Sequence, residues 1–278
     1  MTGKSFHFIS GLPRSGSTLL AAILRQNPRF HASMTSPVAS LFTSMLNTMS
    51  SRNEASLFIT DRQRARLVKG IFENFYADFE DKELIFDTNR IWSAKLPALS
   101  QLLPESRVIC CVRNVAWIMD SFERMIRRNP LLVSKMFSEA DVGTVYTRLE
   151  AMAHPNRIVG FAWSALKEAY YGEQASSMLL VEYDLLASSP EKTLKLIYEF
   201  IGEDYFEHDF NNVEYNEEQF DENLGLPGLH TVRKKVELKT RNTILPPDLF
   251  EKYDGMSFWK DQTGSRANVI SKAASNDE

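Results

Sequence analysis

Short apolar runs alternate with helical stretches along the first half of this chain. Continuous apolar runs occur at residues 6–10, 83–86 and 107–112. Between the first two of these runs, a stretch from about residue 61 to residue 79 carries apolar positions near a period of 3.6, as an amphipathic helix does. Unbroken apolar strands that alternate with helices are typical of a parallel sheet that is covered on both faces. The sequence therefore predicts an α/β three-layer sandwich with a central parallel β-sheet and helices on both faces.

The residues between the first apolar run and the next helical stretch favour an anion-binding turn. They read GLPRSGST, from Gly11 to Thr18. A strand, a tight turn and a helix together direct free backbone N–H groups and the positive end of the helix dipole at one point. Glycine at both ends of the turn lets the backbone approach an oxyanion closely. The residues expected to hold the anion are Arg14, Ser15, Gly16, Ser17 and Thr18.

The spacing of this turn is close to that of a P-loop, G-x-x-x-x-G-K-[ST], but Ser17 stands where the lysine belongs. A nucleoside triphosphatase needs that lysine on the terminal phosphates of its substrate. Here the cation lies within the turn instead, at Arg14. The turn therefore favours a phosphate or sulfate site without triphosphatase chemistry. An ordinary strand-to-helix turn with capping hydroxyls is the alternative reading.

Composition and charge narrow the class of protein further. The chain has 278 residues, 44% of them hydrophobic, and a formal net charge of −4, so it can bury one full core and shows no basic bias towards nucleic acid. No apolar run is long enough to span a membrane, and the histidines show no metal-ligand spacing. We expect a cytoplasmic protein that has no signal peptide, with adjacent, unpaired cysteines at Cys110 and Cys111. We also expect one domain over residues 1–262, with helical insertions at 36–80 and 122–175 and a disordered tail at 263–278.

A second pair of polar residues follows the strand at residues 107–112. Arg113 comes directly after this strand, and Ser121 lies eight residues later on the following helix. Eight residues are slightly more than two helical turns, so both residues lie on roughly one helix face. Arginine and hydroxyl donors form charge-assisted bonds with phosphate. This pair therefore predicts a second anion site beside the first.

Together these motifs resemble those of sulfotransferases that use 3′-phosphoadenosine 5′-phosphosulfate (PAPS), with the tyrosylprotein and bacterial branch as the nearest pattern. The PRSGST turn resembles the loop that holds the 5′-phosphosulfate, and Val-Arg-Asn with the later serine resembles the 3′-phosphate signature. The segment from Leu179 to Leu186, followed by Pro190 and Phe-Ile-Gly, resembles the family's third motif. This resemblance implies that Tyr183 borders the adenine. It also implies a basic loop over the 3′-phosphate, with Arg233, Lys234 and Lys235 as candidates.

The catalytic base is the point at which this sequence departs from the family pattern. Thr35 occupies the position of the glutamate in the tyrosylprotein branch, and Thr88 occupies the position of a lysine after the third strand. Asp87 is the base candidate, and Arg90 is a candidate for the missing cation. The alternative reading of Asp87 is a helix cap or an ion pair with Arg90. We assign the catalytic roles to Arg14 and Asp87 on this basis.

The function expected from the sequence is transfer of a sulfuryl group from PAPS to a hydroxyl or amine of a small-molecule, peptide or glycan acceptor. No metal, nucleic-acid or membrane partner is expected, and homodimer formation is left open. Two alternatives remain. One is a P-loop kinase-like phosphotransferase, and the other is a non-catalytic nucleotide-binding protein. Apolar residues within the two insertions, such as Phe42 and Trp163, indicate a partly apolar acceptor cleft.

Overall fold

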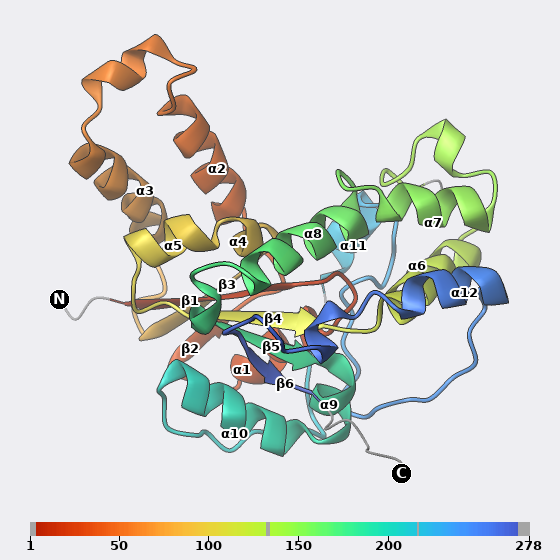
Figure 1. Cartoon of the computed structure of the whole chain (residues 1–278). Coiled ribbons are helices and arrows are strands. Elements are labelled where there is room, and N and C mark those ends of the chain that lie inside the picture. The colour runs from red at the N-terminus through yellow and green to blue at the C-terminus, as the bar shows by residue number, and fades with distance from the viewer. Residues whose placement is uncertain (1–3, 132–133, 216, 272–278) are drawn as a thin grey trace.

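The computed structural model describes residues 4–131, 134–215 and 217–271. Within them, six strands form one sheet in the order β2-β3-β1-β4-β5-β6, and all strand pairs are parallel (Figure 1). The strands are β1 Ser5–Gly11, β2 Phe30–Ala32, β3 Leu84–Thr88, β4 Val108–Val112, β5 Met178–Glu182 and β6 Asn268–Ile270. The predicted parallel sheet is confirmed.

Helices cover both faces of this sheet, as Figure 1 shows: α4, α5 and α8 lie on one face, and α1 and α10 lie on the other. The α-helices are α1 Ser17–Leu24, α2 Val38–Thr48, α3 Asp61–Phe75, α4 Ile91–Ala94, α5 Leu96–Leu102, α6 Val115–Arg128, α7 Val145–Ala153, α8 Ile158–Tyr170, α9 Tyr183–Ser188, α10 Pro190–Ile201, α11 Glu218–Asn223 and α12 Pro247–Asp254. Short 3₁₀ helices are η1 Glu54–Phe58, η2 Glu139–Asp141, η3 Ala175–Ser177 and η4 Phe258–Lys260. The α/β three-layer sandwich is therefore confirmed.

Alternation along the central strands divides the interior into two cores. Phe8 and Cys110 belong to the core beneath α8, whereas Ile9 and Cys111 belong to the core beneath α1. Successive side chains of a strand point to opposite faces. Since both faces are covered, every residue of β4 is buried. This is why the strand reads as an unbroken apolar run in the sequence.

The order of the strands places the polar loops next to one another. β1 lies between β3 and β4. From β1 the chain first adds β2 and β3 on one side, and then crosses over to add β4, β5 and β6 on the other side. Ligands of open parallel sheets bind beyond the carboxyl ends of the strands at such a reversal. The loops that follow β1, β3 and β4 therefore meet at one edge of the sheet, as expected from the sequence.

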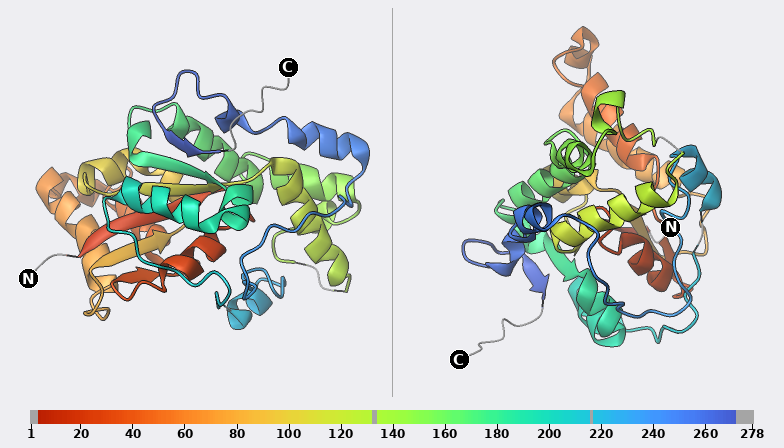
Figure 2. Two further views of the ribbon diagram at one scale, coloured as in Figure 1. Left: turned by 90° about the horizontal axis from the view of Figure 1, so that it is seen from below. Right: turned by 90° about the vertical axis from the view of Figure 1, so that its right-hand side faces the viewer.

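The first insertion forms a helical arm, residues 36–80, that contains α2, η1 and α3. The arm projects from the body on the side of the sheet covered by α8 (Figures 1 and 2). Its root is fixed by buried residues such as Phe42 on α2 and Phe72 on α3, which pack together with Trp92 on α4. The second insertion, 122–175, contains the second half of α6, then η2, α7 and α8.

The chain beyond residue 263 does not lack structure throughout, which corrects the sequence prediction. Residues 268–270 form β6, which pairs with β5 from Leu179 to Val181. Three residues are too few for an apolar pattern to be recognised, so the sequence carries no signal for this edge strand. Residues 272–278 of the predicted tail lie outside the described residues. Among the described helices, none has the length and apolar character needed to cross a membrane, and the cytoplasmic location stays a prediction.

Two buried histidines make the stability of this fold dependent on pH. Burial lowers the pKa of His7 and of His208 from 6.5 to about 4. Between these values the unfolded chain binds more protons than the folded chain, so the free energy of unfolding falls as the pH falls from 6.5 towards 4. The expected slope is about 1.4 kcal/mol per pH unit for each histidine. The free energy of unfolding is measured by urea unfolding at pH 7 and at pH 5. It should change less between these pH values in the His7→Gln/His208→Gln variant than in the wild-type chain.

Candidate functional site

The turn between β1 and α1 has the backbone conformation of an anion-binding loop. Gly11 and Gly16 have φ angles of 104° and 96°, and Arg14 has a φ of 57°, all in the left-handed region that glycine adopts most easily. A Cβ atom on Gly11 would lie 2.1 Å from the backbone oxygen of Cys111, so only glycine fits beside β4. Because α1 begins at Ser17, the N–H groups of its first turn point outward from the helix N-terminus.

The hydroxyl groups of this turn do not all face the same way. Ser15 is buried, and its Oγ lies within hydrogen-bonding distance of the backbone oxygens of Leu12 and, at 2.8 Å, of Cys111. In this position the hydroxyl holds the turn against β4, and donation by the Ser15 side chain to an anion stays a prediction. The backbone N–H group of Ser15 keeps that predicted role. Ser17 and Thr18 are partly exposed, and their contact with a ligand stays a prediction.

Arg14 joins the first turn to the helix that follows β4. Its Nε donates to the hydroxyl of Ser121 at 3.2 Å, across a separation of 107 residues. Its Nη1 donates to the backbone oxygen of Leu229. Ser121 lies two turns into α6 and is buried. The two anion-binding motifs that the sequence suggests therefore lie side by side.

Arg113 follows β4 directly and stacks on Tyr183 at the start of α9. Its guanidinium carbon lies 4.3 Å from the centroid of the Tyr183 ring. Its Nε is buried and has no hydrogen-bond partner in the described part of the chain. The Tyr183 ring also touches the first turn, because a Cβ atom on Gly16 would come within 2.8 Å of Tyr183 Cδ2. These three residues form one wall with an unsatisfied donor in it, which marks a place for an acceptor group of a ligand.

Positive charge accumulates along this wall. Burial, followed by the charge of Arg113, lowers the pKa of Arg14 to about 10. Burial also lowers the pKa of Arg113. Arg241 adds to this effect, because its charge lowers the pKa of Arg14 and its own pKa is lowered by burial and by Arg113. Because the charges of Arg113 and Arg241 lower the pKa of Arg14, the potential here is positive and favours a bound anion.

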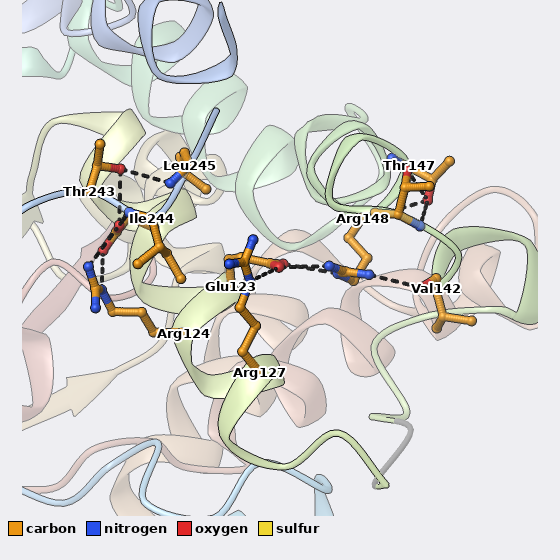
Figure 3. A network of polar contacts seen from close by, with 11 residues as sticks. Glu123, Arg124, Arg127, Val142, Thr147, Arg148, Thr243, Ile244 and Leu245 are labelled. Atoms are coloured by element: carbon orange, nitrogen blue, oxygen red, sulfur yellow. Dashed lines mark hydrogen bonds and ion pairs between the residues drawn. The ribbon is translucent and has the colours of Figure 1, made fainter. Parts of the chain in front are cut away.

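Two carboxylates of α6, both 0% exposed, fix the segments around the wall. Asp120 accepts a bond from the backbone N–H of Ile244 at 2.8 Å and pairs with Arg241 at 2.7 Å. Glu123 pairs with Arg148 of α7 at 2.7 Å (Figure 3). The ion pair of Arg241 and the bond from Ile244, both made to Asp120, hold the C-terminal segment against α6.

The basic segment that the sequence analysis singled out makes different contacts. Arg233 and Lys234 are exposed, and Lys234 pairs with Glu214 at 3.1 Å. Phosphate binding by these two residues stays a prediction. The sequence analysis missed Arg241, because a single arginine in a loop belongs to no motif. The signal that identifies it is its ion pair with Asp120, which only the fold reveals.

Asp87, the base candidate from the sequence, is 0% exposed and surrounded by donors. Its Oδ2 accepts bonds from Ser36 Oγ and from Tyr76 OH, both at 2.5 Å, and its Oδ1 accepts a bond from Trp92 Nε1 at 2.7 Å. Burial raises the pKa of Asp87, although these bonds oppose the shift. Such an environment suits a carboxylate that ties the helical arm and α4 to β3. Its role as a catalytic base stays a prediction.

A histidine–aspartate pair lies beside Arg14, and the sequence analysis did not single it out. His230 Nδ1 lies 2.5 Å from Asp221 Oδ1, and the backbone N–H of His230 donates to Asp221 Oδ2 at 2.8 Å. His230 follows Leu229, whose carbonyl oxygen accepts a bond from Arg14. Burial lowers the pKa of His230, Asp221 opposes this shift, and the charges of Arg14 and Arg90 reinforce it. With Nδ1 anchored by a carboxylate, Nε2 of the neutral ring can accept a proton.

A parallel sheet with a glycine-rich, cation-bearing turn at its carboxyl edge defines an α/β protein of the P-loop-containing type. The model of one protein family, described as the sulfotransferase family, matches residues 7–207, which is well over half of the chain. The chain belongs to the sulfotransferase family. No significant match is found among curated proteins. The tyrosylprotein-like branch stays a prediction.

Solved structures of sulfotransferases are similar to this chain over most of its length. The sulfotransferase domain from the curacin biosynthetic pathway has a TM-score of 0.51 at 15% identity, with 91% of this chain and 92% of that chain covered. For the sulfotransferase domain of the Synechococcus PCC 7002 olefin synthase, the TM-score is 0.43 at 19% identity, with 91% and 89% covered. For the sulfotransferase from Alicyclobacillus acidocaldarius, it is 0.47 at 15% identity, with 81% and 90% covered. The first of these likenesses supports the α/β fold.

Proposed function

We propose that this chain transfers a sulfuryl group from PAPS to a hydroxyl or amine of an acceptor. The observation that carries the proposal is the contact between Arg14 Nε and Ser121 Oγ, at 3.2 Å. This contact brings two anion-binding motifs to the same space. A nucleotide that carries phosphate groups at both its 3′ and 5′ positions needs two such motifs at short range.

The residues around this space fit the proposed nucleotide. The unsatisfied Nε of Arg113 is a donor for the 3′-phosphate, next to the hydroxyl of Ser121. Arg14 and the N–H groups of the first turn are donors for the 5′-phosphosulfate. The ring of Tyr183 offers a flat apolar face for the adenosine. Burial lowers the pKa of both Arg14 and Arg113, and the charge of Arg113 adds to the shift of Arg14, so a bound anion of this charge would stabilise both cations.

The chain's own residues would then provide charge stabilisation and proton transfer. Arg14 and the backbone N–H groups stabilise the negative charge that develops on the leaving 5′-phosphate as its bond to sulfur breaks. The new bond forms between sulfur and the acceptor oxygen or nitrogen, and the proton of the acceptor must go to a base. We infer that His230 Nε2 takes this proton, with Asp221 holding the ring in position. Asp87 is the second candidate for the base.

The two alternative functions have less support. A kinase-like phosphotransferase would need a cation at position 17, where this chain has Ser17. The substitution of Thr35 for the family's glutamate is what favours a non-catalytic nucleotide-binding protein. The pair of His230 and Asp221 weakens that argument, since it places another base beside Arg14.

Titration calorimetry with 3′-phosphoadenosine 5′-phosphate, without magnesium, tests the donor site. The wild-type chain is expected to bind this nucleotide at micromolar concentrations. Arg113→Ala should weaken binding about 10–100-fold, because charge-assisted bonds worth about 1.5–3 kcal/mol are lost. Arg128→Ala, an exposed arginine at the end of α6, is the matched control and should bind normally. Lys234→Ala tests the predicted basic loop in the same assay.

Two results would contradict this proposal. The first is the absence of binding to the wild-type chain at micromolar nucleotide. The second is ATP turnover that requires magnesium, which would favour the phosphotransferase instead.

A further inference from the structure

The helical arm, residues 36–80, ends in a tip at which two large apolar side chains face solvent. Leu57 is 86% exposed and Phe58 is 87% exposed, and both belong to η1. The tip lies at the end of the arm away from the sheet (Figures 1 and 2). The interior of the arm is supplied by other residues, such as Phe42 and Phe72. The two side chains at the tip therefore contribute little to folding.

Hydrogen bonds within the tip hold these two side chains in their exposed position. The Asn53 side chain caps η1 by accepting a bond from the N–H of Ala55 at 3.1 Å. Thr60 and Gln63 form a reciprocal capping box at the start of α3. Exposure of Leu57 and Phe58 is therefore built into the local structure.

Basic residues flank this apolar tip in the sequence. Residues 51–70 contain five arginines and lysines and two acidic residues, a net charge of +3 in a chain whose total is −4. Arg64 pairs with Asp61, and Lys69 pairs with an acidic neighbour on α3. The remaining three arginines are exposed and form no ion pair with the described residues: Arg52, Arg62 and Arg66.

We propose that this tip docks on the surface of an anionic lipid bilayer. Leu57 and Phe58 would enter the boundary between headgroups and acyl chains, and Arg52, Arg62 and Arg66 would contact lipid phosphates. Such a bilayer is the surface that offers an apolar layer directly behind a layer of negative charge. Two copies of the chain would instead bring two basic tips together, and their charges would repel. The sequence analysis expected no membrane partner because no spanning segment is present, but docking at the surface requires none.

Co-sedimentation of the full chain with lipid vesicles tests this proposal. Vesicles of equal parts phosphatidylglycerol and phosphatidylcholine are expected to bind the chain, and vesicles of phosphatidylcholine alone are not. High salt should weaken the binding. The Leu57→Ser/Phe58→Ser variant should lower the partition coefficient at least about tenfold. The Arg52→Gln/Arg62→Gln/Arg66→Gln variant should lower it about 100-fold.

The control is Leu131→Ser, which removes another leucine that is 96% exposed but lies outside the arm. It should bind vesicles as the wild-type chain does. Equal binding by all variants, or no binding to anionic vesicles, would overturn the proposal. A wild-type dimer that the Leu57→Ser/Phe58→Ser variant converts to monomers in sedimentation velocity, without vesicle binding, would assign the tip to a second copy and would also overturn it. Nucleotide binding is measured separately, so the outcome does not depend on the proposed enzymatic function.

Discussion

Replacing Arg14 by asparagine is expected to lower kcat for sulfate transfer by on the order of 10²–10³-fold. Asparagine tolerates the left-handed backbone of this position, where φ is 57°, so the turn should keep its shape. What is lost is the guanidinium that contacts Ser121 and Leu229 and stabilises the leaving 5′-phosphate. The rate is measured as transfer of labelled sulfate from PAPS to an acceptor found by screening small molecules, peptides and glycans.

Arg128→Asn is the matched control for this measurement, because Arg128 is exposed and is the last residue of α6, seven residues after Ser121. It should transfer sulfate at the wild-type rate. Circular dichroism of the Arg14→Asn variant separates loss of catalysis from loss of fold. A correctly folded variant with wild-type kcat would show that the first turn does not stabilise the leaving group.

Replacing His230 by glutamine is expected to lower kcat by about 10²–10⁴-fold, the usual contribution of a general base. Glutamine can still hydrogen bond to Asp221, so the segment should remain in place. Donor binding should change little, because in the proposed arrangement His230 faces the acceptor. The kcat of the variant and its affinity for 3′-phosphoadenosine 5′-phosphate are measured side by side.

The pH profile distinguishes His230 from Asp87 as the base. Since burial lowers the pKa of His230 below 6.5, the ring is neutral at pH 7, and the wild-type rate should fall only as the pH drops below that value. His230→Gln should abolish this acid limb. If Asp87 is the base instead, Asp87→Asn should abolish the fall in rate at low pH, and His230→Gln should leave that fall unchanged.

Asp87→Asn is expected to act on stability more than on rate. Bonds from Ser36, Tyr76 and Trp92 all end on the Asp87 carboxylate. In the variant, an NH₂ group replaces one of the two carboxylate oxygens. At least one of the three donors would then have no acceptor. An unsatisfied buried group costs about 1–3 kcal/mol, and the melting temperature should fall accordingly.

Prediction from the sequence succeeded where the signal is local. The turn from Gly11 to Gly16, and the position of Ser121 on the helix that follows β4, depend on residues close together in the chain. The buried strands were recognisable because covered parallel strands read as unbroken apolar runs. Because the carboxyl ends of parallel strands lie at one edge of a sheet, the loops that follow these strands were expected to meet there.

Prediction from the sequence failed where the site depends on residues far apart in the chain. Arg14 and Leu229 are separated by 215 residues, and the segment around His230 has no helical or strand period. The importance of Arg241 follows from its pair with Asp120, and the burial of Asp87 follows from donors on three other segments. No spacing rule connects residues of this kind.

The site combines a turn near the start of the chain with the segment from Asp221 to Arg241. Ribosomes release these parts in order, so the sheet strands β1 to β5 are complete before the base and the third arginine emerge. On the proposed mechanism, a nascent chain can begin to fold around its nucleotide turn but cannot transfer sulfate. Activity therefore begins only once residues 221–241 have been synthesised and have packed against α6 and Arg14.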